Sequence, residues 1–249
     1  MKLLDNKHAV ITGANRGIGL AATDTFAANG CHIWACVRNI DDNAFSDHIS
    51  ILSENHGVDI TPVELDLSND ESVAASAKTI ARQKLPIDII VNNAGIIDTS
   101  LFAMTSIKSM HNMFDVNFFA QMAFTQKLVR SMIKQKNGSI INIASSAAIE
   151  GNAGRLSYAA SKSAIITASK VMSRELGPHG IRVNAVAPGL TDTDMMRDNH
   201  DTDIVETTLE RVSLRRVAKP EEIANSLLFL GSDLASYVTG QVISVDGGM

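Results

Sequence analysis

The amino-acid sequence predicts an α/β fold in which one doubly wound parallel sheet has helices on both faces. Short β-branched runs alternate with helical segments along all 249 residues. Several runs are apolar almost throughout, as is typical of strands buried on both faces. No linker rich in Pro, Gly or Ser divides the chain, and no internal repeat is visible. We therefore expect one domain, residues 1–249, with a sheet of about seven strands.

The β-branched runs define the expected strands in chain order. They cover residues 9–12, 32–37, 60–65, 87–91, 139–144, 181–187 and 241–245. The first helical segment shows its periodicity on Ile18, Ala22 and Phe26. A longer helix carries an apolar stripe at four-residue spacing, made of Met110, Phe114, Phe118 and Met122. We expect both of these faces to pack in the core.

Composition and charge exclude several classes of protein. Hydrophobic residues make up 45% and charged residues 20%, with a net charge of −5, a balance that disfavours general binding of nucleic acid or a membrane. No secretory signal and no apolar run long enough to span a membrane is visible. The only cysteines are Cys31 and Cys36, too few for a disulfide framework. We expect a protein of the cytoplasm.

A glycine-rich turn follows the first strand and opens a helix. Its spacing is G-x-x-x-G-x-G over residues 13–19. Glycine permits a tight turn and a close approach of the backbone to a pyrophosphate, and N–H groups at the start of a helix attract the anion. The residues expected to form this dinucleotide site are Gly13, Asn15, Arg16, Gly17, Ile18 and Gly19.

The end of the second strand indicates which dinucleotide binds. An acidic residue there would bond the 2′-hydroxyl of NAD(H), whereas a basic residue would meet the 2′-phosphate of NADP(H). The strand is followed by Arg38, and Arg16 adds a second guanidinium, a group that can bind phosphate bidentately. Asp41 and Asp42 follow closely and keep NAD(H) as the alternative. The pattern favours NADP(H).

Several motifs together resemble those of the classical short-chain dehydrogenase/reductases. They are Thr12-Gly-x-x-x-Gly-x-Gly19, Asn92-Asn-Ala-Gly95, Ser145, Tyr158-Ala-Ala-Ser-Lys162, Pro188-Gly189, Pro220-Glu-Glu-Ile-Ala224 and Asp246-Gly-Gly248. They follow the family's order over essentially the whole chain, and the pattern is most similar to 3-oxoacyl-[acyl-carrier-protein] reductases. The resemblance implies a Rossmann-type NAD(P)-binding fold and an oxidoreductase. It also implies a homotetramer built from two long helices and the last strand.

The resemblance further implies a catalytic group of Asn117, Ser145, Tyr158 and Lys162. Tyr158 and Lys162 lie four residues apart in a helical segment, so both project from one face. Because a phenol has a pKa near ~10, we expect the neighbouring ammonium to lower the pKa of Tyr158. Tyr158 could then exchange a proton with a carbonyl oxygen as hydride is transferred. In the family, the serine at the place of Ser145 hydrogen-bonds the substrate oxygen, with Ser146 as the adjacent alternative, and Asn117 holds a water beside Lys162.

Further cofactor contacts follow from the resemblance alone. The expected residues are Asp66, Leu67, Asn93, Ala94, Gly95, Pro188, Gly189, Thr191 and Thr193. By the same resemblance, Asp66 meets the adenine amino group, and Tyr158 and Lys162 lie at the nicotinamide ribose.

The segment over residues 190–215 is expected to form a lid over the active site. It is polar and acidic near its centre and then becomes helical, and in the family this region varies with the substrate. No metal is expected, because Tyr158 and Ser145 would polarise the carbonyl. His200, Asp201 and Asp203 are interpreted as a polar loop rather than as metal ligands.

Three functions remain open from the sequence. The first is NADP(H)-dependent reduction of a 3-oxoacyl thioester, whose acidic acyl carrier protein would dock on a basic surface. Candidates for that surface are Arg130, Lys134, Lys136, His179, Arg215 and Arg216. The second function is oxidation or reduction of a small ketone, sugar or polyol. The third is a non-catalytic NADP-binding sensor or scaffold, against which the complete set of catalytic residues argues.

Overall fold

The computed structural model describes residues 2–199 and 202–249, which contain one parallel sheet of seven strands. The strands are β1 (His8–Thr12), β2 (His32–Val37), β3 (Ile60–Glu64), β4 (Ile89–Asn92), β5 (Gly138–Ile143), β6 (Ile181–Pro188) and β7 (Val242–Val245). Their order across the sheet is β3-β2-β1-β4-β5-β6-β7. The predicted doubly wound α/β architecture is confirmed, and each predicted strand end lies within two residues of the observed one.

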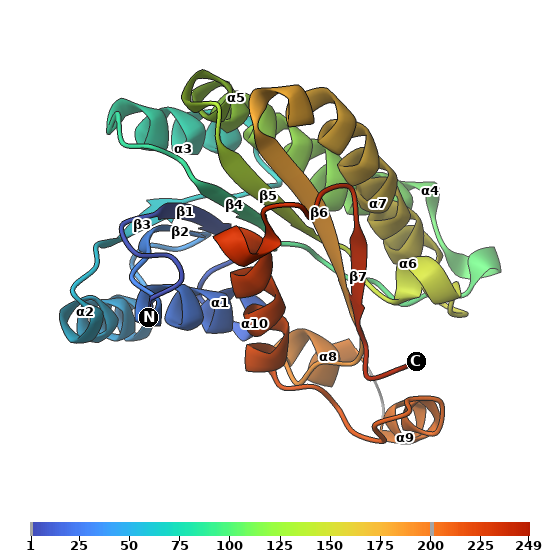
Figure 1. Cartoon of the computed structure of the whole chain (residues 1–249). Coiled ribbons are helices and arrows are strands. Elements are labelled where there is room, and N and C mark those ends of the chain that lie inside the picture. Colours follow the sequence, from blue (N-terminus) through green and yellow to red (C-terminus); the bar gives the residue numbers. More distant parts are fainter. Residues whose placement is uncertain (1, 200–201) are drawn as a thin grey trace.

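Helices cover both faces of this sheet (Figure 1). One face carries α1 (Gly17–Ala28), α2 (Asn43–His56) and α10 (Pro220–Gly231), and the other carries α3 (Asp70–Arg82), α5 (Ala120–Gln135) and α7 (Leu156–Leu176). The shorter helices are α4 (Ile107–Phe114), α6 (Ala147–Glu150), α8 (Asp194–Asn199) and α9 (Thr202–Leu209). The 3₁₀ turns are η1 (Phe102–Met104), η3 (Gly177–His179) and η4 (Asp233–Ala235), and η2 (Asp115–Phe119) is a π-helical turn.

Capping residues explain where several of these helices begin and end. The carboxylate of Asp42 accepts a hydrogen bond from the N–H of Phe45 at the start of α2. At the start of α3, the side-chain oxygen of Asn69 accepts hydrogen bonds from the N–H groups of Glu71 and Ser72. At the other end of α2, Gly57 adopts φ +67°, the left-handed conformation that glycine reaches without strain. The carboxylate of Asp42 therefore serves as the N-cap of α2.

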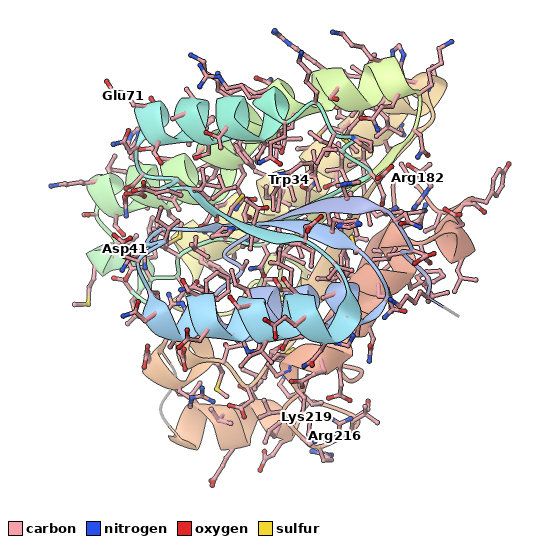
Figure 2. The ribbon with its side chains drawn as sticks, turned by 90° about the vertical axis from the view of Figure 1, so that its left-hand side faces the viewer. Trp34, Asp41, Glu71, Arg182, Arg216 and Lys219 are labelled. Atoms are coloured by element: carbon pink, nitrogen blue, oxygen red, sulfur yellow. The ribbon has the colours of Figure 1, made fainter. Side chains whose placement is uncertain are left out.

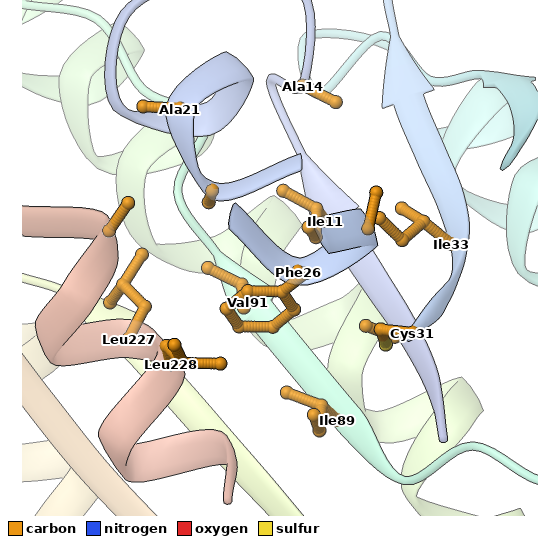
Figure 3. Packing of buried hydrophobic residues seen from close by; sticks show 14 of the residues in the cluster. Ile11, Ala14, Ala21, Phe26, Cys31, Ile33, Ile89, Val91, Leu227 and Leu228 are labelled. Carbon is orange, nitrogen blue, oxygen red and sulfur yellow. The ribbon is translucent and has the colours of Figure 1, made fainter. Parts of the chain in front are cut away.

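Two apolar clusters hold the helices to the sheet. On the face of α1 and α10, Phe26 packs among buried side chains that include Val91 and Leu227 (Figure 3). On the opposite face, Trp34 and Phe124 belong to the second cluster, and Figure 2 shows Trp34 between the sheet and the helices above it. Full burial of one such large side chain stabilises a fold by about 1.5–3 kcal/mol.

The two cysteines are divided between these clusters. Cys31 belongs to the first cluster and Cys36, in β2, to the second. Both thiols are free and buried. Burial raises the pKa of both, because the thiolate is disfavoured where water is excluded.

The helical region around the Phe/Met stripe differs from the sequence prediction. The stripe of Met110, Phe114, Phe118 and Met122 is only partly buried, and only Phe118 and Met122 pack against a small buried cluster. The π-helical turn η2 separates α4 from α5 and rotates the later residues relative to the earlier ones. The fully buried positions are instead Met113, Asn117, Gln121, Phe124 and Leu128. The expectation that the whole stripe packs in the core is therefore only partly correct.

No helix in the described ranges 2–199 and 202–249 is both long enough and apolar enough to cross a bilayer. The location of the protein in the cytoplasm stays a prediction.

The strand order creates a crevice between β1 and β4. From β1 the chain continues outward through β2 and β3, whereas β4 to β7 extend in the other direction. The connections that leave β1 and β4 therefore diverge. Ligands of doubly wound sheets bind at such a point, beyond the carboxyl ends of the strands.

Candidate active site

A cavity of about 660 Å³ lies at the crevice between β1 and β4. The sequence-predicted residues that line it are Gly13, Asn15, Arg16, Gly17, Ile18, Arg38, Asp66, Leu67, Asn93, Ala94, Gly95, Ser145, Tyr158, Lys162, Pro188, Gly189, Thr191 and Thr193. Gly19 and Asn117 do not line the cavity and are buried. The structure thus brings together residues from both halves of the sheet.

The glycine-rich turn forms one end of the cavity. The helix α1 begins at Gly17, and no side chain caps its first turn, so its first N–H groups remain available to an anion. Gly17 has φ +54°, a conformation that other residues adopt only with strain. A Cβ on Gly19 would lie 2.0 Å from the carbonyl oxygen of Gly13. Gly19 is therefore required for packing within the turn rather than for contact with a ligand.

Thr12 and Asn93 fix this turn against the end of β4. The hydroxyl of Thr12 accepts hydrogen bonds from the backbone N–H of Asn93 at 2.9 Å and of Ala94 at 3.0 Å. The side-chain amide of Asn93 donates to the carbonyl oxygen of Thr12 at 2.9 Å. Thr12 was not predicted as a site residue, although its place at the end of the first strand was the available signal. Asn93 braces the turn in addition to lining the cavity.

The side chains of Tyr158 and Ser145 meet where α7 crosses the end of β5. A hydrogen bond with Ser145 lowers the pKa of Tyr158, and the charge of Arg155 lowers it further. Burial outweighs both, so the pKa of Tyr158 stands above its ordinary value. Ser145 also accepts a hydrogen bond from the N–H of Ala147 at 3.2 Å. The pairing with Tyr158 favours Ser145 over the adjacent Ser146.

Lys162 lies one turn further along α7. Its Nζ donates to the carbonyl oxygen of Ile143 at 2.7 Å and lies 5.9 Å from the centre of the Tyr158 ring. Burial lowers the pKa of Lys162 to about 8, because the charged form is disfavoured away from water. The expected lowering of the Tyr158 pKa by this ammonium is therefore wrong in direction for the free protein, where desolvation dominates.

Asn117 reaches the site through the π-helical turn η2. Its side chain accepts from the N–H of Ile96 at 2.8 Å and donates to the carbonyl oxygen of Ile96 at 2.9 Å. It also donates to the hydroxyl of Ser161 at 3.2 Å. A Cβ on Gly95 would lie 3.0 Å from Oδ1 of Asn117 and 3.6 Å from Nζ of Lys162. Asn117 thus holds the segment after β4 next to Lys162.

Charged residues line the cavity at the start of α1 and after the ends of β2 and β3, namely Arg16, Arg38 and Asp66. Hydrogen bonds from the N–H and the hydroxyl of Ser68 lower the pKa of Asp66, and the charge of Arg38 lowers it further. Asp41 and Asp42 do not line the cavity.

Described residues of the predicted lid in α8 and α9, among them Met195, Met196 and Ile204, also line the cavity. Figure 1 shows α8 and α9 beyond the end of β7. Lining residues that the sequence did not single out include Thr99, Asn152, Arg155 and Met249. Their residue types carry no motif, and only the fold brings them together. His200 and Asp201, which were interpreted as part of a polar loop, lie outside the described residues. The side chain of Asp203 is also not described.

Comparison with known proteins identifies the family. The family model described as enoyl-(acyl carrier protein) reductase matches residues 13–249. The 3-oxoacyl-[acyl-carrier-protein] reductase FabG of Chlamydia trachomatis is 40% identical over 247 residues, which cover 99% of this chain and 98% of that protein. The protein of the same name from Thermotoga maritima is 39% identical over 251 residues, with the same two coverages of 99% and 98%. The chain belongs to the short-chain dehydrogenase/reductase family.

Solved structures of short-chain dehydrogenase/reductases share this fold. A 7α-hydroxysteroid dehydrogenase complexed with NADH and 7-oxoglycochenodeoxycholic acid matches with a TM-score of 0.92 at 34% identity, covering 98% of this chain and 94% of that one. A putative NAD(P)-dependent gluconate 5-dehydrogenase from Beutenbergia cavernae, with bound NADP, matches with a TM-score of 0.91 at 32% identity, covering 98% and 97%. As a short-chain dehydrogenase/reductase, the chain is an oxidoreductase that uses a nicotinamide cofactor. The alternative of a non-catalytic sensor or scaffold is set aside.

Proposed function

We propose that this short-chain dehydrogenase/reductase reduces the 3-oxo group of an acyl thioester on acyl carrier protein, with NADP(H) as its cofactor. The main support is full-length likeness to 3-oxoacyl-[acyl-carrier-protein] reductases, combined with a cavity that Ser145, Tyr158 and Lys162 all line. The matching family model is described as an enoyl reductase. The relatives that align over nearly the whole chain favour a carbonyl substrate instead.

The chemistry of the proposed site is proton transfer coupled to hydride transfer. When bound, the nicotinamide supplies the hydride. Ser145 donates a hydrogen bond to the substrate oxygen, and the hydroxyl of Tyr158 donates the proton to it. Lys162, with a pKa of about 8, can exchange a proton at Nζ near neutral pH. Asn117 holds the segment after β4 through Ile96 and also bonds Ser161, the neighbour of Lys162.

The residues around the cavity fit a phosphorylated dinucleotide. The uncapped start of α1 suits a pyrophosphate, and Arg16 and Arg38 supply positive charge for a 2′-phosphate. The acidic alternatives are less well placed, because Asp42 caps α2 and neither Asp41 nor Asp42 lines the cavity. These contacts support NADP(H) over NAD(H).

The basic candidates for docking of acyl carrier protein fall into two groups. Lys136 and His179 are near one another, since a Cβ on Gly180 would lie 2.3 Å from the carbonyl oxygen of Lys136. Both precede strands β5 and β6, at the end of the sheet opposite the cavity, and Arg130 and Lys134 lie in the helix α5 that leads there. Only Arg215, the last residue of the predicted lid, and Arg216, which follows it, lie in the part of the chain next to the cavity lining. The first group therefore lies away from the cavity of its own chain, and Arg215 and Arg216 are the better-placed candidates.

Exposed apolar side chains support association between copies of this chain, as the homotetramer implied by the family resemblance requires. Phe102 and Met104 are 77% exposed, Ile107 66% and Phe119 57%. They belong to η1, α4 and η2, next to the long helices α5 and α7. Large apolar side chains exposed on a surface often mark sites of contact between proteins. Pairing of this surface between copies would bury them.

A substrate panel tests the proposed activity. Oxidation of NADPH is followed with acetoacetyl thioesters of acyl carrier protein, an enoyl thioester, small ketones, sugars, polyols and a 7-oxosteroid. We expect the highest kcat/KM with the 3-oxoacyl thioester. A clear preference for a small ketone or sugar would replace the proposed substrate with the second function, and a preference for the enoyl thioester would reject the carbonyl chemistry.

The variant Tyr158→Phe tests the proposed proton donor. Loss of general acid catalysis is expected to lower kcat by at least ~100-fold, while the Kd for NADPH, measured by fluorescence titration, stays close to that of the wild type. The matched control is Tyr237→Phe, since Tyr237 is fully exposed and not part of the cavity. Undiminished turnover in Tyr158→Phe would show that another group supplies the proton.

A further inference from the structure

Arg155 occupies a position that local rules of helix formation disfavour. It is the N-cap residue of α7, and its side chain makes no capping hydrogen bond. Positive charge at the start of a helix opposes the helix dipole. The side chain is nevertheless only 7% exposed, and burying a cation costs free energy. A residue that breaks several local rules at once is a candidate for a functional role.

The contacts of Arg155 join three segments around the cavity. Nη1 donates to the hydroxyl of Thr99, in the segment after β4, at 2.5 Å. Nη2 donates to the carbonyl oxygen of Asn199, the last residue of α8, at 3.1 Å. The neighbouring Gly154 accepts a hydrogen bond from the N–H of Ser100 at 2.9 Å. Thr99 and Arg155 both line the cavity together with Tyr158.

We propose that Arg155 is a positioning residue of the active site, which holds the lid helix α8 and the segment after β4 against the start of α7 and keeps a fixed positive charge in the cavity wall beside Tyr158. The inference rests on the proposed function for the role of Tyr158. It extends that function by naming the residue that couples the lid to the catalytic phenol. Arg155 itself transfers no proton.

Among the charged groups near Tyr158, Arg155 is the one that we assign to supply positive charge beside the phenol. Asp98 attracts the guanidinium of Arg155. Lys162 follows Tyr158 on α7, with Nζ 5.9 Å from the ring centre and hydrogen-bonded to the carbonyl oxygen of Ile143. Two further charged residues of the cavity wall are engaged elsewhere: Asp194 pairs with Arg197 at 2.7 Å, and Arg211 pairs with Glu150 at 2.6 Å. A positive charge near a phenol favours its ionised form, and that of Arg155 lowers the pKa of Tyr158 against the effect of burial.

An optical titration tests the electrostatic part of the proposal without any substrate. The chain has two tyrosines, so the variant Tyr237→Phe leaves Tyr158 as the single source of tyrosinate absorbance. In this background, Arg155→Gln is expected to raise the titration midpoint of Tyr158 by roughly one pH unit. Arg155→Lys keeps the charge and is expected to titrate like the parent. Equal midpoints in all three proteins, or an equal shift in both Arg155 variants, would overturn the electrostatic role.

Steady-state kinetics test the positioning part. Lysine cannot hold Thr99 and Asn199 together as the planar guanidinium does. Both Arg155→Lys and Arg155→Gln should therefore raise the KM for the 3-oxoacyl thioester about tenfold, as expected for losing a hydrogen bond to a charged group. The Kd for NADPH should not change, and Arg174→Gln, an exposed position on the same helix, serves as the matched control. An unchanged KM in both variants would overturn the positioning role.

The two measurements also separate this inference from the proposed function. If the wild-type protein does not turn over the thioester, the proposed function fails, and the KM is measured with whichever substrate the panel identifies. The titration of Tyr158 still decides whether Arg155 acts on the phenol. Circular dichroism of each variant confirms that α7 is intact before either comparison is made.

Discussion

Lys162 is an ionisable side chain in a place that water hardly reaches. It is 3% exposed, and its one hydrogen bond to a backbone carbonyl, that of Ile143, does not balance the loss of solvent. Its pKa is lowered to about 8 for that reason. An apolar side chain of similar length would suit the position better as far as folding is concerned. The buried ammonium of Lys162 therefore lowers the stability of the fold, although the proposed proton exchange requires it.

Replacing Lys162 with Met should make the protein inactive but more stable. At neutral pH we expect the free energy of unfolding to rise by about 1–2 kcal/mol, measured by urea denaturation. Below pH 8 both states of the wild type carry the proton, so the full cost of the charge is present. Between about pH 8 and pH 10.5, only the unfolded state keeps the proton on Lys162. The free energy of unfolding of the wild type therefore rises with pH in this range, and the difference in stability between Lys162→Met and the wild type shrinks. Lys170→Met, on the exposed side of α7, should show neither effect.

Arg38 offers a second test at the scale of one residue. If its guanidinium binds the 2′-phosphate, Arg38→Asp should weaken NADPH binding by about tenfold or more while changing NADH binding far less. Fluorescence titration with both dinucleotides gives the two Kd values. Asp41→Asn, at an exposed residue outside the cavity, is the control. Equal losses for NADPH and NADH would mean that Arg38 does not read the phosphate.

At the scale of single elements, the π-helical turn η2 determines where Asn117 points. The turn places Asn117 among the fully buried residues, with its amide on the backbone of Ile96. A continuous α-helix through this region would follow the four-residue spacing of the Phe/Met stripe instead. Single π-helical turns inside helices are often found at functional sites.

Removal of one residue from η2 should abolish activity without unfolding the helix. Deleting Asp115 allows α4 and α5 to join as a continuous α-helix, which rotates Asn117 away from Ile96 by about one residue step. We expect kcat to fall severely while circular dichroism retains its helical signal. Asp115→Ala preserves the turn and should keep nearly normal turnover, because Asp115 is exposed. Similar activity in both variants would show that the turn has no part in placing Asn117.

The strands and the glycine-rich turn could be predicted because each depends on a short-range pattern, whereas the Tyr158–Lys162 pair was predicted from the family resemblance, with the four-residue spacing as support. Strands buried on both faces are apolar runs, and residues four apart share one helix face. The π-helical turn has no such pattern, so the burial of Phe114 and Phe118 was overestimated. The pKa direction of Tyr158 depends on solvent exclusion, which spacing does not report. Arg155 and Thr99 are distant in sequence, and only the packing of α7 against the segment after β4 joins them.

At the scale of the whole molecule, the exposed apolar surface around η1, α4 and η2 determines the expected assembly. We expect a tetramer by light scattering. Phe119→Glu places a charge in the pairing surface and should produce smaller species at micromolar concentration. Ile51→Glu is the control, since Ile51 is 60% exposed on α2, away from that surface. A wild-type monomer, or a tetramer that survives Phe119→Glu unchanged, would contradict this assembly.

The distribution of Cys31 and Cys36 between the two core clusters has a practical consequence for following the motions of this protein. Neither thiol can meet an alkylating reagent while the sheet stays covered, so labelling proceeds only as fast as the covering layers separate. Because the two sulfurs lie in opposite layers, their labelling rates would time the opening of each layer separately. Cys36 is only 1% exposed although it belongs to the cavity wall, so a bound dinucleotide would oppose separation of the layer over Cys36 and slow its labelling more than that of Cys31. The two native cysteines thus allow local unfolding on each face of the sheet to be measured without introducing a label site.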